Sequence, residues 1–186
     1  MIWFERSIDY DLIRSILTHP RIWPHISDDG SPSVEDFQPI RHDAIWYVVV
    51  RDIFVIRDIH EQDSEVLGLW MFVPQNSICW DVHTALLPCA WGERGLTAAR
   101  MLPGWIRQHT PCRRIVTSIP RSNRLAFRFA LKSGMKIYGV NRASYLKAGK
   151  VWDQVCLGLS IGDEPSAGEL EASRPIRRGQ EVEICR

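Results

Sequence analysis

The sequence has no charge excess, no long apolar run and no paired cysteine motif. Lysine and arginine number 23 and aspartate and glutamate 22, so the net charge of +1 gives no reason to expect a nucleic-acid partner. No stretch approaches the ~20 apolar residues that a membrane-spanning helix needs. The five cysteines are odd in number and lack metal-ligand spacing. These absences favour a cytoplasmic protein with no nucleic-acid partner, no membrane and no metal.

The composition is that of one folded domain. Apolar residues make up 45% of the 186 positions, and the eight tryptophans indicate an aromatic-rich core. The last stretch, residues 163–186, differs because it is rich in charge, proline, serine and glycine. We therefore expect a single domain over residues 1–162, followed by a charged C-terminal tail.

Hydrophobic periodicity predicts an α+β fold (α/β mixed). Helices are expected from Asp9 to about Thr18, over 95–107 and over 122–132, with room for a short one near 34–37. Strands are expected at 44–51, 65–73, 78–87, 114–119, 136–140 and 151–161, with 1–4 as a candidate first strand and 54–59 as a shorter extended segment. Successive antiparallel strands followed by a strand–helix–strand crossover indicate a central, mostly antiparallel sheet of six to seven strands flanked by helices.

A glycine turn follows the strand at 78–87. It reads Trp-Gly-Glu-Arg-Gly-Leu-Thr-Ala over residues 91–98 and leads into a helix. Such a turn presents unpaired backbone N–H groups at the positive end of the helix dipole, which favours phosphate oxygens, and Arg94 adds a fork of donors. The alternative is a turn that only connects two elements. Pro103, inside the following helix, predicts either an end near Leu102 or a kink.

The next helix carries cap signals at both ends. Ser122 is a plausible N-cap, and Gly134 stands where a left-handed C-cap belongs. Asn123, Ala126, Gly134 and Met135, taken with the preceding glycine turn, resemble the GNAT acetyltransferase superfamily over residues 44–161.

The resemblance implies a GNAT-like sheet that splays between segments 85–87 and 114–119. It also implies acetyl-CoA as cosubstrate, with its pyrophosphate on the glycine turn and its pantetheine arm beside the helix that carries the asparagine. The residues expected to contact this cosubstrate are Leu86, Leu87, Arg94, Gly95, Leu96, Thr97 and Asn123.

Two features depart from the family pattern, the glycine loop and the acid on the helix that carries the asparagine. The loop of the family reads Arg/Gln-x-x-Gly-x-Gly/Ala; here Gly92 stands at the first position, Gly95 matches and Thr97 stands at the last. Seven residues after the asparagine, many members carry a tyrosine that protonates the leaving thiolate, whereas this chain has Ala130. A methyl group donates no proton, so the usual acid is missing.

Asp81 and His83 are the candidate catalytic residues. They stand two apart on one strand, so they face the same side of the sheet. An imidazole there can deprotonate an amine, with Asp81 supporting the charge that it gains. The alternatives are that this face of the sheet is simply solvated, or that His83 makes a buried hydrogen bond.

The segment at 19–30, His-Pro-Arg-Ile-Trp-Pro-His-Ile-Ser-Asp-Asp-Gly, leaves a second function class open. It resembles the N-terminal part of small GNAT-like proteins encoded by tailed bacteriophages, some of which are associated with phage particles or their assembly. In GNAT-like folds this loop covers the acceptor pocket. Its histidine and aspartate spacings are unspecific for a metal, which disfavours a metal site.

Two functions therefore remain. The first is an acetyl-CoA-dependent N-acyltransferase with a degenerate cofactor loop, acting on a small-molecule or protein amine acceptor by direct transfer. Its oxyanion would be held by backbone N–H groups near 86–90. The alternative is a catalytically inactive GNAT-fold protein with a structural or interaction role, such as a phage-encoded particle or assembly protein. Its partners would be phage structural proteins, in the host cytoplasm or the virion.

Overall fold

The computed structural model describes residues 1–56 and 61–162, which form one mixed sheet with helices on both faces. The strands are β1 (Ile2–Ser7), β2 (Trp46–Ile56), β3 (Glu61–Pro74), β4 (Cys79–Leu86), β5 (Arg114–Pro120), β6 (Lys136–Lys147) and β7 (Lys150–Ser160). The helices are α1 (Tyr10–Leu17), α2 (Trp23–Ile26), α3 (Glu93–His109) and α4 (Arg124–Lys132), with a short 3-10 helix, η1 (Pro88–Ala90), before α3. Among the described residues, no helix is both long and apolar enough to cross a membrane.

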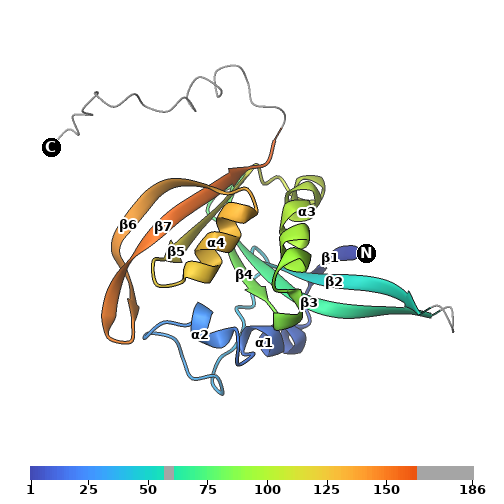
Figure 1. Ribbon diagram of the computed structural model, residues 1–186, viewed down its shortest axis with the longest axis horizontal. Helices are drawn as coiled ribbons and strands as arrows, with labels where there is room; N and C mark the ends of the chain where they lie inside the picture. Colours follow the sequence, from blue (N-terminus) through green and yellow to red (C-terminus); the bar gives the residue numbers. More distant parts are fainter. Residues whose placement is uncertain (57–60, 163–186) are drawn as a thin grey trace.

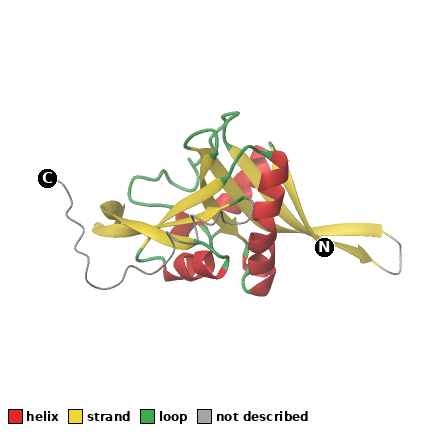
Figure 2. Ribbon diagram, turned by 90° about the horizontal axis from the view of Figure 1, so that it is seen from above, coloured by secondary structure: helices red, strands yellow, loops and turns green. Residues whose placement is uncertain are grey.

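The sheet has the strand order β1-β2-β3-β4-β5-β7-β6. Every neighbouring pair is antiparallel except β4 and β5, which are parallel and joined by α3. Figure 1 shows the β6–β7 hairpin at one side of the molecule and the β2–β3 hairpin extending from the other, an arrangement also seen in Figure 2. The predicted mostly antiparallel sheet with flanking helices is confirmed.

The sheet separates two main hydrophobic cores, one on each face. Alternate side chains of β2, β3 and β4, including the buried Trp70 and Phe72, pack with Leu102 and Ile106 of α3. The intervening side chains pack with Ile13 and others of α1. A third cluster packs α4 against β5 and β7. We refer below to the face covered by α1 as the α1 face.

Several predicted element bounds are wrong. The segments at 44–51 and 54–59 belong to one strand, β2, because Asp52 pairs in register with Glu65 of β3 and does not interrupt the ladder; residues 57–60 lie outside the described part. A turn replaces the expected helix near 34–37, where the Phe37 N–H bonds the Ser33 carbonyl once. The expected strand at 136–140 is only the beginning of β6, and the predicted tail at 163–186 lies outside the described residues.

The two main helices also differ from expectation at their ends. α3 continues through Pro103 to His109, which excludes the alternative of an end near Leu102 and extends the helix expected over 95–107 by two residues at each end. The N-cap of α4 is Asn123, whose Oδ1 accepts from the Ala126 N–H at 3.1 Å, and not Ser122. The predicted cap at Gly134 is confirmed by its φ of +99° and by the Met135 N–H bond to the Ala130 carbonyl.

Candidate functional site

A V-shaped gap opens between the two parallel strands. β4 and β5 pair over three positions only, from Cys79–Arg114 to Asp81–Val116. Both strands then continue, to Leu86 and to Pro120, without pairing with each other. The predicted splay between segments 85–87 and 114–119 is therefore present, and the ends of the two strands form its walls.

The backbone of Leu86 faces this gap. The Leu87 N–H bonds the Leu67 carbonyl at 2.8 Å, which makes that pair a hydrogen-bonded one of the β3–β4 ladder. In an antiparallel ladder, successive residues direct their backbone groups to opposite edges of the strand. The N–H and C=O of the preceding residue, Leu86, therefore point away from β3, toward β5. Gly68 lets β3 approach this closely, because a Cβ there would lie 2.3 Å from the Ala85 carbonyl oxygen. Leu86 thus offers backbone groups to the gap, whereas the Leu87 N–H is used within the sheet.

Trp91 is a residue of this site that sequence reasoning did not single out. Its Nε1 donates to the Leu86 carbonyl oxygen at 2.8 Å, and the Arg21 guanidinium lies 4.9 Å above its ring. The indole is 44% exposed, so it lies at the mouth of the gap and not in the core. Only its position just before Gly92 could have suggested this role.

The N-terminus of α3 lies at the end of β4, beyond η1. Gly92 is the N-cap residue, with φ +94°, and no side chain caps the helix there. The first bond of the helical ladder runs from the Leu96 N–H to the Gly92 carbonyl, so the N–H groups before Leu96 have no partner within the helix. A Cβ at Gly92 would meet nothing within 4 Å, which shows open space beside the turn. Leu96 itself is buried and Thr97 is exposed on the first turns.

Gly95 is packed against the preceding loop. A Cβ at this position would lie 2.6 Å from the Ala90 carbonyl oxygen and 2.9 Å from Leu86 Cδ1. Only glycine fits, because the nearer contact is a backbone atom that a rotamer change cannot move. The sequence singled out this glycine for close approach of a phosphate, and the structure adds a packing reason for it.

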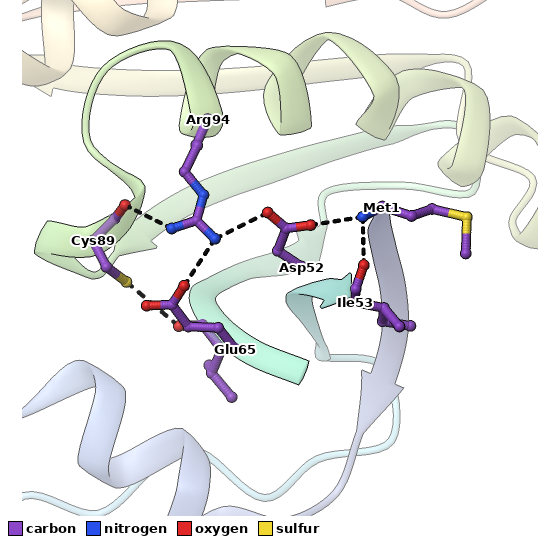
Figure 3. A network of polar contacts seen from close by, with 7 residues as sticks. Met1, Asp52, Ile53, Glu65, Cys89 and Arg94 are labelled. Atoms are coloured by element: carbon purple, nitrogen blue, oxygen red, sulfur yellow. Dashed lines mark hydrogen bonds and ion pairs between the residues drawn. The ribbon is translucent and has the colours of Figure 1, made fainter. Parts of the chain in front are cut away.

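Arg94 lies in a network of ion pairs (Figure 3). Its Nη2 bonds Asp52 Oδ2 at 2.9 Å and Glu65 Oε2 at 2.8 Å, and its Nη1 donates to the Cys89 carbonyl. The N-terminal ammonium and the Arg94 guanidinium lower the pKa of Asp52. These contacts hold the start of α3 against β2 and β3. Both terminal nitrogens of Arg94 already donate to protein oxygens, so a phosphate would have to compete with these bonds. The phosphate contact of Arg94 stays a prediction.

Asp81 and His83 lie on the α1 face, as the alternation predicted. Their partners on β3 are Val73 and Met71, and Met71 packs against the α1 core. The His83 side chain is exposed, whereas Asp81 Oδ1 is buried and bonds no group in the described chain. Burial raises the pKa of Asp81, and the nearby His83 and the Val82 N–H oppose that rise. An accessible imidazole therefore stands beside a poorly solvated carboxylate.

Replacing Asp81 with asparagine is expected to stabilise the protein at pH 7. Because burial raises the folded-state pKa above 3.8, the carboxyl favours folding in its neutral form, and this contribution is lost as the pH rises through the raised pKa. The side chain is partly solvated, so the gain is small: roughly 2 °C in Tm, or about 0.5–1 kcal/mol. Thermal melts at pH 7 and pH 3 test this. Equal midpoints at pH 7, or a gain that persists at pH 3, would contradict it.

Asn123, a candidate cosubstrate contact, and Ala130, the position where the family's acid would stand, lie at opposite ends of α4. Asn123 uses Oδ1 as the helix cap, and its Nδ2 donates to the His25 carbonyl of α2 at 3.4 Å. Ala130, at the position of the expected acid, is 4% exposed and packs against Ile119 and Leu157. The methyl group thus points into the core between α4 and the sheet, and this position supplies no proton donor.

A cavity of about 270 Å³ lies between α2, the N-terminus of α4 and the tip of the β6–β7 hairpin. Its polar and aromatic lining consists of His25, Ser122, Asn123, Tyr145, Lys147 and Trp152. Figure 1 shows α2 between α1 and the hairpin tip. The expectation that the segment at 19–30 covers a pocket thus has a physical counterpart, because His25 and Pro24 line this cavity.

The hairpin tip holds the segment after α2 in place. Both carboxylate oxygens of Asp29 accept backbone bonds at 2.7 Å, from the N–H groups of Ala148 and Gly149. These two bonds lower the pKa of Asp29. The Tyr145 hydroxyl donates to the Ser27 carbonyl at 2.8 Å, and Lys147 Nζ donates to the carbonyls of Pro24 and Ser27. No sequence pattern links residues so far apart, so the role of the hairpin was not predicted.

Within residues 1–56 and 61–162, no group of three or more histidine, cysteine, aspartate or glutamate side chains is placed to hold a metal ion. No protein-family model matches the sequence, and no curated protein is similar to it.

Solved structures share the fold. Spermidine N-acetyltransferase from Vibrio cholerae, in complex with CoA and spermine, superposes with a TM-score of 0.67 at 13% identity, covering 86% of this chain and 95% of the other. A chimera of that enzyme with hSSAT gives a TM-score of 0.66 at 12% identity, with the same coverage. A protein inferred to be a phosphinothricin N-acetyltransferase gives 0.62 at 15% identity, covering 88% of this chain and all of the other. These likenesses confirm the GNAT fold.

Proposed function

We propose that the protein is an acetyl-CoA-dependent N-acyltransferase that acetylates an amine by direct transfer. The observation that carries this proposal is the gap between β4 and β5, which has an uncapped helix N-terminus at its end. The fold of known N-acetyltransferases supports it as analogy.

The residues around the gap fit the cosubstrate. The turn at Gly92 has open space beside it and backbone N–H groups ahead of the α3 ladder, which suits a pyrophosphate. The gap-facing edge of β4 at Leu86 suits an extended amide chain, which can pair with it as a strand does. Bound there, acetyl-CoA would supply the acetyl group as an activated thioester. Of the expected contacts, Leu86, Gly95, Leu96 and Thr97 lie at these two places, and Asn123 borders the cavity near α2.

His83 is the proposed base. It is exposed on the α1 face, where an acceptor amine can reach it, and it would take the proton that the amine loses on attack. Asp81 would support the resulting positive charge. The Leu86 N–H, directed into the gap, would donate to the carbonyl oxygen as negative charge develops there. Since Ala130 donates no proton, solvent would protonate the departing sulfur.

Calorimetry with acetyl-CoA tests the proposal at its first step. Micromolar affinity is expected, and the bond from Trp91 Nε1 to the Leu86 carbonyl must then rearrange, since the cosubstrate needs the same edge of β4. A change in tryptophan fluorescence that is lost in Trp91→Phe would report this rearrangement. Absence of binding at millimolar acetyl-CoA would contradict the proposal.

Three observations favour the alternative, an inactive GNAT fold with an interaction role. Ala130 replaces the expected acid, the Arg94 donors face carboxylates, and the Leu86 carbonyl is already bonded by Trp91. The resemblance of the segment at 19–30 to phage-encoded proteins would make phage structural proteins the partners. Lack of acetyl-CoA binding would leave this function as the better one.

A further inference from the structure

The cavity beside α2 carries positive charge and aromatic rings but no carboxylate. The indole of Trp152, the phenol of Tyr145, the imidazole of His25 and the ammonium of Lys147 line it. Apart from Ser122 and Asn123, the remaining lining residues are two prolines and an alanine. No aspartate or glutamate among the described residues belongs to this lining.

Lys147 keeps a donor for a ligand. Its ammonium has three N–H groups, and the carbonyls of Pro24 and Ser27 accept two of them. Within the described part of the chain, no carboxylate forms an ion pair with it. A charged donor that is held in place and only partly used can recognise an anionic oxygen at the cavity wall.

The nearest carboxylates are turned elsewhere. Asp29 accepts the N–H groups of the hairpin turn with both oxygens, and Asp28 Oδ1 accepts from the Gly30 N–H and the Ser31 hydroxyl. Burial raises the pKa of Tyr145, and the charges of these two aspartates add to that rise. The charge of Asp29 also interacts with that of Lys147, but the oxygens of both aspartates accept hydrogen bonds from loop atoms and do not line the cavity.

The cavity opens on the same face of the sheet as His83. Asp81 pairs with Val116 of β5, and Val116 pairs with Gly158 of β7, so these three side-chain positions share the α1 face. Trp152 stands six residues before Gly158 on β7, an even step, and therefore shares that face as well. A molecule held at Trp152 thus lies on the side of the sheet from which the proposed base is accessible.

We propose that the acceptor is a primary amine with an aromatic body and a carboxylate at its far end, which Trp152 and Lys147 select over a polyamine. This inference rests on the proposed function. The Trp152 indole lines the cavity and carries the Lys150 ammonium 4.0 Å from its ring centroid, so the aromatic body would pack beside an indole that already holds a cation. Lys147 would donate to the carboxylate. A polyamine would bring positive charge to Lys147 with no lining carboxylate to neutralise it.

Three acceptors of matched design test the inference: 4-(aminomethyl)benzoate, its uncharged isostere 4-methylbenzylamine, and spermidine. The expected kcat/KM for the benzoate is about tenfold or more above that for the isostere, and lowest for spermidine. Lys147→Met should remove the preference for the carboxylate. Lys132→Met, the same change at the exposed end of α4, should keep it. A preference for spermidine, or a carboxylate preference that survives Lys147→Met, would overturn the inference.

Two further measurements separate the possible failures. Tyr145→Phe removes the bond to the Ser27 carbonyl but keeps the charge of Lys147, so it should retain the preference for the carboxylate even if α2 loosens. Calorimetric binding of the expected product, 4-(acetamidomethyl)benzoate, requires no turnover. If acetyl-CoA binds and this product does not, the acceptor class is wrong. If acetyl-CoA itself fails to bind, the proposed function is wrong as well.

Discussion

Acetyl transfer by the His83→Ala protein is expected to be roughly 10²–10⁴-fold slower than by the unaltered protein, the usual contribution of a positioned base. His83 is exposed on the α1 face beside the buried Asp81 oxygen, and the expected acid at position 130 is a buried alanine. Steady-state kinetics with saturating acetyl-CoA measure the effect on kcat.

The matched control for this loss is His109→Ala. His109 is an exposed histidine at the end of α3, stacked on Trp105, and its removal should leave turnover unchanged. Acetyl-CoA affinity should be nearly the same in both variants, since neither side chain lies at the Gly92 turn. Turnover of His83→Ala at the level of the control would remove His83 from the mechanism.

Gly95→Asp is expected to abolish acetyl-CoA binding and to cost about 3 kcal/mol or more of unfolding free energy. The new Cβ would overlap the Ala90 carbonyl oxygen, 2.6 Å away, which forces α3 away from the loop that carries Trp91. The added carboxylate would also repel a phosphate at the helix N-terminus. Chemical denaturation and calorimetry together measure the two losses.

The same substitution at Gly104 is the control. Gly104 lies in the same helix, and a Cβ there would meet nothing within 4 Å. Gly104→Asp should therefore bind acetyl-CoA normally and keep most of the stability. Gly95→Ala separates the two causes, because it introduces the overlap without the charge. Native stability in Gly95→Ala would refute the packing argument, and normal affinity in Gly95→Asp would refute the phosphate site.

The sequence predicted the elements whose signals are local. The Asp9 cap, the left-handed Gly134 and the alternation around His83 all depend on neighbours within a few residues, and all are found as expected. The order of strand, glycine turn and helix was the more specific part of the pattern that predicted the GNAT-like fold. Pro103 left an early end and a kink open, and α3 continues through it because burial of the helix against the sheet outweighs one lost backbone bond.

The parts of the site that depend on distant partners were not predicted. No local pattern indicates the ion-pair partners of Arg94, because Asp52 and Glu65 lie on two other strands, far away in the sequence. Trp91 reads as a turn residue, although its indole bonds the edge of β4. The walls of the cavity come from α2, from the start of α4 and from β6–β7, which meet only when the whole sheet is assembled, so no local pattern predicts them.

The contacts of Asp29 also determine when the cavity can exist. They join residues 119 and 120 positions apart, across most of the described chain. Closing so long a loop has an entropic cost that local contacts do not offset, so the hairpin tip can meet α2 only after the strands between them have paired. During synthesis, a chain that ends before β6 already contains the β4 edge and the α3 turn but none of the residues that the hairpin contributes to the cavity wall. The residues of the proposed cosubstrate site are thus all present before the proposed acceptor site is complete, and the proposed recognition of the acceptor is the last property that the growing chain acquires.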